Sequence, residues 1–460
     1  MSAQHLERRH AELLVQGGMV VTPAGVERID LACVDGRILA LGDLQQSWSA
    51  DTRLDARGLH VLPGVIDSQV HFREPGLVHK ENLEAGTRGA VLGGVTALFE
   101  MPNTHPLTLR AADLKAKLEA ARGRAWCDHA FYIGGSDLNA ESLAELENLP
   151  GCAGVKIFMG SSFGSLLADD TQVLRRILSH GRRRVAVHAE DEARLRERKH
   201  LVEASGDPRQ HPLWRDETSA LMATRRIVQL AEEIGRRIHI LHVSSAAEMA
   251  YLAHHRRRVT VEVTPHHLTL QAPECYERLG TLAQMNPPLR ERHHQEALWQ
   301  GIRTGVVDVI GSDHAPHRLD EKAQPYPQSP SGMTGVQTLL PLMLDHLQAG
   351  RLSLQRLVDL TSAGPARIFG IEGKGRIAPG FDADFSIVDL GARRRIRNDW
   401  IASVSGWTPY DGVTVTGWPI HTVVRAQVVV CDETLRGQPQ GRPLEFLETR
   451  PAASRRCSPG

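Results

Sequence analysis

The strongest constraint on the fold is a repeated alternation of short apolar runs with longer segments of helical periodicity. Between Val61 and Gly311 the apolar runs are rich in valine, isoleucine and phenylalanine, and the segments between them repeat with a period of about 3.6 residues. Near-continuous apolar strands are typical of a parallel sheet that is covered on both faces. The pattern predicts an α/β fold with a (β/α)8 TIM-like barrel, and a doubly wound open sheet is the alternative. The eight candidate strands are residues 61–72, 96–103, 128–135, 154–160, 184–190, 238–244, 259–265 and 306–314.

The two ends of the chain follow a different pattern. Short alternating strands separated by glycine and aspartate precede residue 61 and follow residue 373, and they predict one small β-sandwich domain formed from both chain ends. We therefore expect 1–60 and 374–440 to form the β-sandwich and 61–373 to form the barrel. The segment 441–460 is rich in proline, arginine and serine and is expected to be a C-terminal tail.

Composition limits the kinds of partner. Lysine plus arginine and aspartate plus glutamate each number 54, so the net charge is zero and gives no long-range attraction to nucleic acid or to an anionic membrane. No window approaches the roughly 20 apolar residues of a membrane span, and the charged start MSAQHLERRH does not match a secretory signal. The six cysteines are far apart and form no CxxC pair, as in a reduced protein. We expect a soluble, cytoplasmic protein that acts on a small molecule.

Histidine is abundant, and its position in the predicted elements differs from case to case. Runs such as HHRRR at 254–258 are interpreted as solvated helix faces. Other histidines stand at the carboxyl ends of predicted strands, which in a barrel meet at one rim and form the active site. A single buried histidine is commonly a hydrogen-bonded core residue, but three histidines and an aspartate on one rim favour a metal site of the kind that zinc prefers. The rim residues are Gln69, His71, Arg73, Lys156, His188, His242, Asp313, His314 and His317.

Seven segments carry a family resemblance: IDSQVHFREPG, EMPNT, GVKIFMG, VHAED, LHVSS, MNPPLR and GSDHAPH. In order and spacing they resemble the motifs of dihydroorotases and of their cyclic amidohydrolase relatives, the hydantoinases and allantoinases. REPG, MPNT and DHAPH are the specific ones, because allantoinase-like sequences tend to carry other residues in place of this arginine, this asparagine and the last histidine. The resemblance implies reversible, metal-dependent hydrolysis of dihydroorotate to N-carbamoyl-aspartate, a step of de novo pyrimidine biosynthesis.

The same resemblance implies roles for the rim residues. His71 and Asp313 would hold one zinc ion, His188 and His242 a second, and Lys156 would bridge the two. Because a charged ammonium is a poor ligand, Lys156 is expected to be N-carbamylated, which turns it into a bidentate carboxylate. The alternative is a buried Lys156 that pairs with Asp313. Asp313 is also the expected catalytic residue, which collects the proton of the attacking water and returns it to the departing nitrogen.

One position departs from the family pattern. Family members usually have H-x-H at the end of the first strand, whereas this chain has Gln69, Val70 and His71. An amide oxygen is a weaker ligand for zinc than an imidazole nitrogen. Three outcomes are open: a weak two-metal centre, one ion held by Lys156, His188 and His242, or loss of catalysis with the fold retained. An active enzyme with one or two zinc ions is favoured, because the residues that would bind substrate all remain.

Substrate recognition is expected to depend on a carboxylate clamp. Arg73 can form two parallel hydrogen bonds to a carboxylate, and by resemblance Asn103 and His317 would complete the clamp while Asn286 lies beside the ring. Structural alternatives exist: Arg73 pairs with Glu74 or Glu100, Asn103 caps the following helix, and His317 is a loop residue. Arg290 is interpreted as a surface or loop ion-pair residue, and His266 and His267 are not assigned as ligands.

Two other functions stay open. The first is a hydantoinase or allantoinase, whose ring would lack the carboxylate that Arg73 needs. The second is a non-catalytic dihydroorotase-like subunit that partners aspartate transcarbamoylase, for which Gln69 is the hint. We further expect a homodimer, since dimers are the commonest symmetric assembly, and we interpret the polar, proline-rich loop 318–335 as a lid.

Overall fold

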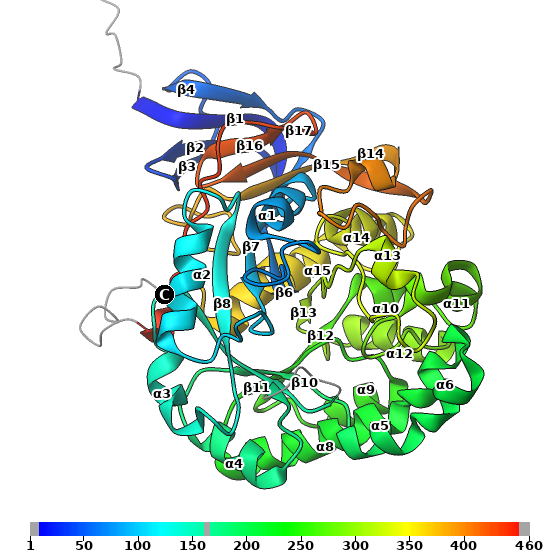
Figure 1. Ribbon diagram of the computed structural model, residues 1–460. Helices are drawn as coiled ribbons and strands as arrows, with labels where there is room; N and C mark the ends of the chain where they lie inside the picture. Colours follow the sequence, from blue (N-terminus) through cyan, green and yellow to red (C-terminus); the bar gives the residue numbers. More distant parts are fainter. Residues whose placement is uncertain (1–8, 161–165, 450–460) are drawn as a thin grey trace, which may run out of the picture.

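A barrel of parallel strands forms the centre of the molecule. The computed structural model describes residues 9–160 and 166–449 (Figure 1). Eight strands lie side by side in chain order, and each pair of neighbours is parallel. They are β6 (Val65–Val70), β7 (Val95–Glu100), β8 (Asp128–Gly134), β9 (Cys152–Phe158), β10 (Val185–His188), β11 (Ile238–Ile240), β12 (Val259–Val263) and β13 (Val309–Ile310).

The first and last strands of this sheet meet just beyond their ends. The backbone N–H of His71 donates to the carbonyl oxygen of His314 at 2.7 Å, and Val70 and His314 form an isolated parallel bridge. The sheet is therefore a nearly closed barrel. The predicted (β/α)8 fold is confirmed, and the open doubly wound sheet is excluded.

Helices follow the strands and cover the outside of the barrel (Figure 1). The longest, α8 (Glu217–Ile234), begins where the Asp216 side chain accepts the N–H of Ser219 and ends at Gly235, which has a φ of 85°. Its inward face buries Ala223, Ile227, Leu230 and Ala231, the periodicity that the sequence predicts, while Leu221 is half-buried. The other principal helices are α1 (Leu83–Leu92), α2 (Ala111–Ala121), α4 (Thr171–Ser179), α9 (Ala246–Leu252), α12 (Arg292–Arg303), α14 (Leu339–Gln348), α15 (Leu354–Val358) and α16 (Gly364–Phe369).

Shorter helices lie in the connections between these elements. They are α3 (Leu143–Leu146), α5 (Glu192–Arg198), α6 (His200–Ser205), α7 (His211–Trp214), α10 (Pro265–Thr269), α11 (Glu274–Leu279) and α13 (Leu319–Lys322).

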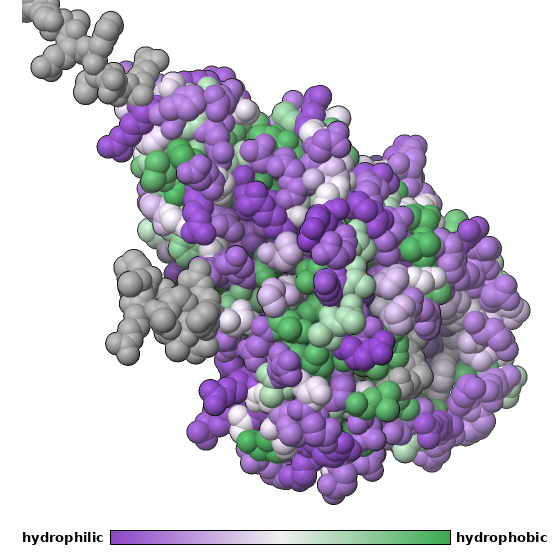
Figure 2. Space-filling view, turned by 60° about the vertical axis from the view of Figure 1, so that its left-hand side comes forward, coloured by the Kyte–Doolittle hydropathy of each residue, from purple (hydrophilic) through white to green (hydrophobic). Residues whose placement is uncertain are grey.

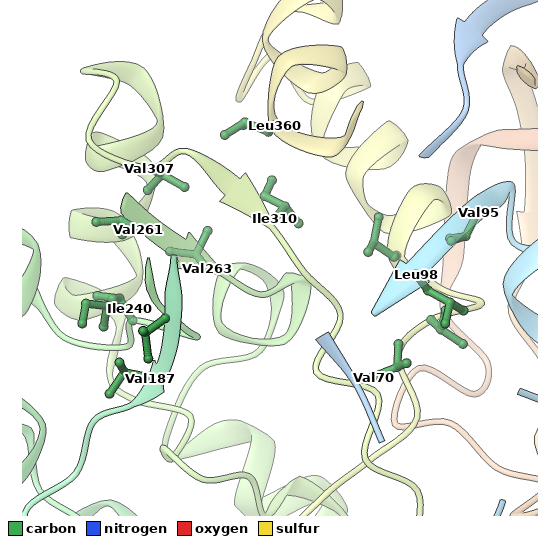
Figure 3. Close-up of a cluster of buried hydrophobic side chains, with 14 of the residues drawn as sticks. Val70, Val95, Leu98, Val187, Ile240, Val261, Val263, Val307, Ile310 and Leu360 are labelled. Atoms are coloured by element: carbon green, nitrogen blue, oxygen red, sulfur yellow. The ribbon is translucent and has the colours of Figure 1, made fainter. Parts of the chain in front are cut away.

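The main core lies between the barrel strands and these helices. Branched aliphatic side chains dominate it, among them Val70, Val187, Ile240, Val263 and Ile310, which Figure 3 shows together. All five are at most 1 % exposed. Since β-branched residues suit a pleated sheet that is buried on both faces, the valine- and isoleucine-rich runs of the sequence become the barrel strands.

Both ends of the chain contribute to a second, mixed sheet of nine strands, at the top of Figure 1. The expected first barrel strand is in fact divided, because β5 (His60–Pro63) pairs with this sheet while β6 belongs to the barrel. A separate apolar cluster, which includes Leu13, Val15, Phe385 and Ile387, stabilises the small β domain. The remaining strands are β1 (Arg9–Thr22), β2 (Gly25–Val34), β3 (Arg37–Gly42), β4 (Trp48–Asp55), β14 (Phe385–Arg395), β15 (Thr414–Val424), β16 (Gln427–Cys431) and β17 (Thr434–Leu435).

The end of the described chain packs against the amino-terminal side of the barrel. Within the segment predicted as a tail, Leu444 and Phe446 are buried, and the N–H of Leu444 donates to the carbonyl oxygen of His129 at 2.8 Å. Residues 450–460 of the predicted tail lie outside the described residues.

Hydrophilic residues predominate on the face shown in Figure 2, with hydrophobic residues gathered near its middle. The five cysteines within the described ranges are all free thiols, and Cys457 lies outside these ranges. In the part of the chain that the structure covers, every helix is too short or too polar to span a lipid bilayer.

Candidate functional site

A pocket opens at the carboxyl ends of the barrel strands. It encloses about 540 Å³, part of which is open solvent. All the predicted metal ligands line it, together with three of the four predicted substrate-binding residues. The lining residues are Gln69, His71, Arg73, Asn103, Lys156, Phe158, Gly160, His188, His242, Met285, Asn286, Asp313, Ala315, Ser331 and Gly332.

Two histidines from neighbouring strands face each other in this pocket. His188 ends β10 and His242 follows β11, and Nδ1 of His188 lies 3.0 Å from Nε2 of His242. Two imidazole nitrogens bound to one tetrahedral zinc ion lie about 3.3 Å apart, given Zn–N distances of about 2.0–2.1 Å. Burial lowers the pKa of both rings and so favours their neutral form, which metal binding requires. This pair fits one metal ion.

A second group of side chains lines the same pocket. Asp313 has one carboxylate oxygen 3.3 Å from Nε2 of His71 and 2.9 Å from the Gln69 amide nitrogen, which donates to it. Nδ1 of His71 lies 2.7 Å from the amide oxygen of Asn103 and donates to it, which leaves the Nε2 lone pair for a metal ion. The Gln69 amide oxygen is buried without a hydrogen-bond partner among the described residues. Gln69 is therefore placed as a donor to Asp313.

Lys156 lies on β9 and is 1 % exposed. Burial lowers its pKa to about 7, although Asp313 and Glu262 act in the opposite direction. Its Nζ lies 4.3 Å from the centre of the Phe158 ring. An amine with this pKa is partly neutral near pH 7, and the neutral form is the one that reacts with carbon dioxide. The structure shows no direct ion pair between Lys156 and Asp313 within the described residues, which was the alternative for this lysine.

Arg73 is 3 % exposed and forms part of the pocket wall. Its Nε donates to the carbonyl oxygen of Pro316 at 3.3 Å, and Nη2 lies 3.2 Å from Nε2 of His317. Burial lowers the pKa of Arg73 to about 10, so the guanidinium still carries its charge at neutral pH. Glu74 pairs with Arg124 and Glu100 with Lys117, so neither expected alternative partner binds Arg73.

The remaining predicted substrate-binding residues lie at or behind the wall. The Asn103 side-chain oxygen accepts from His71, and the N-cap of the following helix α2 is Arg110, so Asn103 does not cap that helix. Its Nδ2 is buried and has no hydrogen-bond partner in residues 9–160 and 166–449. His317 does not line the pocket; its Nε2 contacts Arg73 and its Nδ1 lies 3.1 Å from Nζ of Lys80. The Asn286 amide oxygen accepts a hydrogen bond from Nε2 of His211 at 3.1 Å. Ser331 and Gly332, from the expected lid, form part of the wall.

A buried ion pair behind His188 was not predicted. Glu190 lies 2.9 Å from Nε2 of His188 and pairs with Arg215, and both charged side chains are almost fully buried. Burial alone would raise the pKa of Glu190, but Arg215 and His188 lower it to about 2. A carboxylate behind a metal-binding histidine fixes the orientation of its ring. The position of Glu190 two residues after His188 is the only signal in the sequence.

The prediction that Arg290 is a surface or loop ion-pair residue was wrong. It is 4 % exposed and donates to Ser244 Oγ at 3.0 Å and to the carbonyl oxygen of Arg215 at 3.1 Å. Nδ1 of His266 lies 2.9 Å from the Tyr410 hydroxyl group, and Nε2 of His267 lies 3.0 Å from the carbonyl oxygen of Pro287.

Comparisons with known proteins agree with this architecture. The sequence profile of the Amidohydrolase family matches residues 60–429. A dihydroorotase from Methanosarcina mazei is 36% identical over 427 residues, which cover 90% of this chain and 92% of the relative. An allantoinase from Rubrobacter xylanophilus is 37% identical over 447 residues, covering 94% and 97% of the two chains. The structure of an L-hydantoinase (dihydropyrimidinase) from Arthrobacter aurescens superposes with a TM-score of 0.90 at 28% identity, covering 94% of this chain and 99% of that one.

A barrel with histidines, an aspartate and a buried lysine at its carboxyl rim defines a class of hydrolase that is generally metal-dependent. The chain belongs to the amidohydrolase family. It is an enzyme that hydrolyses cyclic amides.

Proposed function

We propose that this protein is a dihydroorotase, which catalyses the reversible hydrolysis of dihydroorotate to N-carbamoyl-aspartate. One observation carries the choice of substrate. The pocket wall holds two buried groups that can only donate: the charged guanidinium of Arg73 and the Nδ2 amide of Asn103, which has no partner among the described residues.

A buried donor without a partner, such as Nδ2 of Asn103, destabilises a protein unless a ligand binds to it. A ring carboxylate supplies acceptor oxygens for both donors and a charge that matches Arg73. Dihydroorotate has such a carboxylate, whereas hydantoin and allantoin do not. His317 would support the clamp from behind Arg73, and Asn286 would lie beside the ring.

The polar residues of the pocket fit a divalent metal centre. His188 and His242 would hold one zinc ion and His71 and Asp313 another, with Lys156 between them. Addition of the neutral Lys156 amine to carbon dioxide, with loss of one proton, would form the bridging carbamate. When bound, zinc lowers the pKa of water and polarises a carbonyl group.

Asp313 would carry the proton during hydrolysis. Water adds to the ring amide carbon, and Asp313 accepts the proton that the water loses. The ring C–N bond then breaks, and the same carboxyl group protonates the departing nitrogen. The Gln69 amide donates to the Asp313 oxygen that lies near His71, so it would orient this carboxylate. In the reverse direction the Arg73 clamp would hold one carboxylate of N-carbamoyl-aspartate.

The test is a comparison of three substrates. The purified protein, loaded with zinc in the presence of bicarbonate, should hydrolyse dihydroorotate with a kcat/KM at least about tenfold above that for hydantoin or allantoin, since one charge-assisted hydrogen bond contributes about 1.5–3 kcal/mol. A preference for hydantoin or allantoin would exclude the proposal.

A second candidate is a non-catalytic subunit that associates with aspartate transcarbamoylase. Gln69 favours it, because an amide replaces the usual first histidine and binds Asp313 itself. This candidate requires a protein that turns over none of the three substrates yet co-elutes with aspartate transcarbamoylase in gel filtration. The same gel-filtration experiment without the partner tests the expected homodimer.

A further inference from the structure

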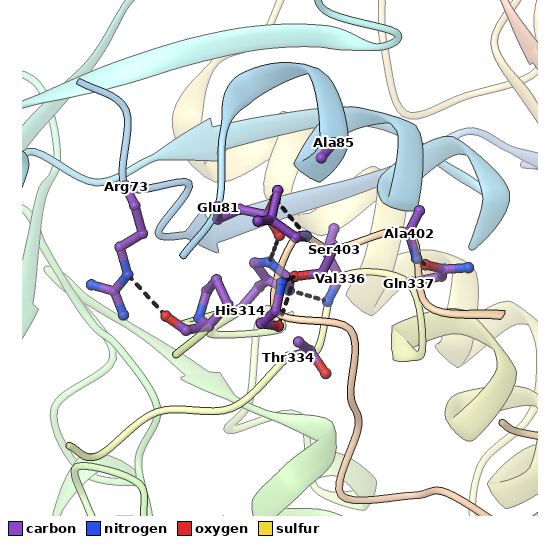
Figure 4. A network of polar contacts seen from close by, with 12 residues as sticks. Arg73, Glu81, Ala85, His314, Thr334, Val336, Gln337, Ala402 and Ser403 are labelled. Atoms are coloured by element: carbon purple, nitrogen blue, oxygen red, sulfur yellow. Dashed lines mark hydrogen bonds and ion pairs between the residues drawn. The ribbon is translucent and has the colours of Figure 1, made fainter. Parts of the chain in front are cut away.

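The hydrogen bonds of His314 determine which of its ring nitrogens carries the hydrogen, although this residue does not line the pocket. It is 2 % exposed and follows Asp313 beyond the end of β13. Nδ1 lies 3.1 Å from the backbone nitrogen of Gly335 and 3.3 Å from that of Val336, while Nε2 lies 3.2 Å from a carboxylate oxygen of Glu81 (Figure 4). Since a backbone N–H can only donate, Nδ1 accepts both bonds and the ring hydrogen is on Nε2, from which it is donated to Glu81.

Glu81 extends this network to another segment of the chain. Its second oxygen accepts the backbone N–H of Asn82 at 3.1 Å and of Val404 at 3.3 Å. Glu81 is fully buried. The side chain of His314 therefore joins the connection after β6, the loop that ends at Val336, and the segment between β14 and β15.

The backbone of His314 is fixed as well. Its carbonyl oxygen accepts the N–H of His71 at 2.7 Å, and its own N–H donates to Ser312 Oγ at 3.0 Å. These bonds hold both neighbours of Asp313, whose φ of 48° lies in the left-handed region that non-glycine residues rarely adopt. Such a conformation costs about 1–3 kcal/mol and persists only where the surroundings impose it.

Ala315, which follows His314, is also bonded to the segment 331–336. The N–H of Ala315 donates to the carbonyl oxygen of Met333 at 2.8 Å. Ala315, Ser331 and Gly332 all line the pocket. Loss of the hydrogen bonds from the backbone N–H groups of Gly335 and Val336 to His314 would therefore release Asp313. It would also release the part of the pocket wall that Ser331 and Gly332 form.

We infer that His314 and Glu81 form a positioning pair, which holds Asp313 in its strained conformation and fixes residues 331–336 against it. His314 acts through these contacts and does not touch the substrate. The inference rests on the proposed function for its kinetic readout alone. Neither residue is among the predicted ligands or substrate-binding groups.

Three substitutions separate the bonds of this pair. In His314→Asn the side-chain oxygen is near the position of Nδ1 and can accept from Gly335 and Val336, but nothing reaches Glu81. In His314→Gln the amide reaches Glu81 but the acceptor for the two backbone amides is lost. Glu81 accepts on both oxygens, whereas a glutamine amide has only one, so Glu81→Gln places an N–H group either against the Nε2 hydrogen of His314 or against the backbone N–H groups of Asn82 and Val404. His346→Gln, at a half-buried histidine on α14, is the matched control.

We expect His314→Gln and Glu81→Gln to lower kcat for dihydroorotate by about 10- to 100-fold with KM within about threefold, because displacing a reacting group by about 1 Å has effects of this size. His314→Asn should retain at least about tenfold more kcat than His314→Gln.

Hydrogen–deuterium exchange gives a readout that is independent of turnover. The peptide that contains Gly335 and Val336 should exchange faster in His314→Gln than in the parent or in His346→Gln. Unchanged exchange and unchanged kcat in His314→Gln would overturn the inference, and if that variant does not fold, parental kcat in Glu81→Gln would overturn it. A parent that does not hydrolyse dihydroorotate would refute the proposed function, and the exchange experiment would still test the pair.

Discussion

Arg73 keeps a positive charge in a place where burial disfavours it. Burial lowers its pKa to about 10, although the negative charges of Asp313, Glu100, Glu321 and Glu81 act in the opposite direction. A cation held in this way is ready to bind an anion. Because the guanidinium can offer two parallel donors, its geometry matters as much as its charge.

The first prediction follows from that geometry. Arg73→Lys keeps the charge but loses the second donor, so kcat/KM for dihydroorotate should fall by about 10- to 100-fold, the scale of one or two charge-assisted hydrogen bonds. Steady-state kinetics would measure the loss, and zinc content should not change. Arg122→Lys, at an exposed arginine paired with Glu119, is the control. Unaltered kinetics in Arg73→Lys would remove the clamp from the mechanism.

The second prediction concerns Gln69, whose amide donates to Asp313. If an amide replaces an imidazole ligand, the site of His71 and Asp313 should bind zinc more weakly than the site of His188 and His242, and occupancy should titrate in two steps. Gln69→His should tighten the weaker step. Metal analysis under limiting zinc would decide: two equally tight ions in the parent would show that Gln69 does not weaken the site.

The residues of the pocket were largely predictable, whereas their supporting contacts were not. His71, Lys156, His188, His242 and Asp313 lie in or shortly after apolar strands, and the carboxyl ends of parallel strands meet at one rim. Their metal-binding roles stay a prediction. Glu81 meets His314 across 233 positions of the sequence, and no local pattern indicates such a pair. The prediction for Arg290 was wrong for the same reason, because the carbonyl and hydroxyl groups that accept its hydrogen bonds come from distant segments.

At the scale of elements, arginines link the strands on the amino-terminal side of the barrel. The run HHRRR is not a solvated helix face as predicted: it precedes β12, where Arg258 donates to the Gly235 carbonyl oxygen and Arg256 pairs with Asp308. Arg184, just before β10, donates to the carbonyl oxygens of Ile238 and Arg258. These guanidinium groups satisfy carbonyl oxygens at the strand ends. A sequence shows their charge but not these acceptors.

Arg183 provides the third prediction. It is 2 % exposed, donates to the carbonyl oxygens of Cys152 at 2.7 Å and Ala153 at 3.2 Å, and stacks on Phe446 with its Cζ 4.3 Å from the ring centre. A lysine cannot satisfy these acceptors together, so Arg183→Lys should lower the free energy of unfolding by about 1–3 kcal/mol. Urea unfolding would measure the loss, and activity at 25 °C should be retained.

The neighbouring Arg182 is exposed and offers a matched control. Arg182→Lys should leave the urea midpoint unchanged. Equal midpoints for Arg183→Lys and the parent would mean that the carbonyl contacts contribute no stability.

At the scale of the whole molecule, the two domains share a core and a buried ion cluster. Val21, Leu62 and Val430 of the mixed sheet belong to the same apolar cluster as the barrel residues Val95 and Leu98. The alternating strands of both chain ends predicted that they would meet. The sequence could not show which charged residues would be buried at the contact between the two domains.

Lys374 is the centre of that ion cluster. Its Nζ lies 2.8 Å from Asp128 on barrel strand β8 and 3.1 Å from Asp382, and it also binds Asp384, directly before β14. Lys374 and Asp128 are almost fully buried. Burial alone would raise the pKa of Asp128, but Lys374 and Arg425 lower it to about 2. The ammonium therefore stabilises the contact between the domains.

The fourth prediction is that Lys374→Met destabilises the protein by about 3–5 kcal/mol at pH 7, because it leaves buried carboxylates without their main counter-charge. In the parent, the low pKa of Asp128 gives stabilisation that is present above its ordinary pKa of about 3.9 and is lost as the pH falls towards 2. In the variant the pKa of Asp128 rises, so protonation relieves the unpaired charge. The difference in urea midpoint between parent and variant should therefore shrink from pH 7 to pH 4. Lys115→Met, at an exposed lysine on α2, should have the urea midpoint of the parent at either pH. A change in midpoint for Lys374→Met that is small or independent of pH would contradict a role for this cluster in joining the domains.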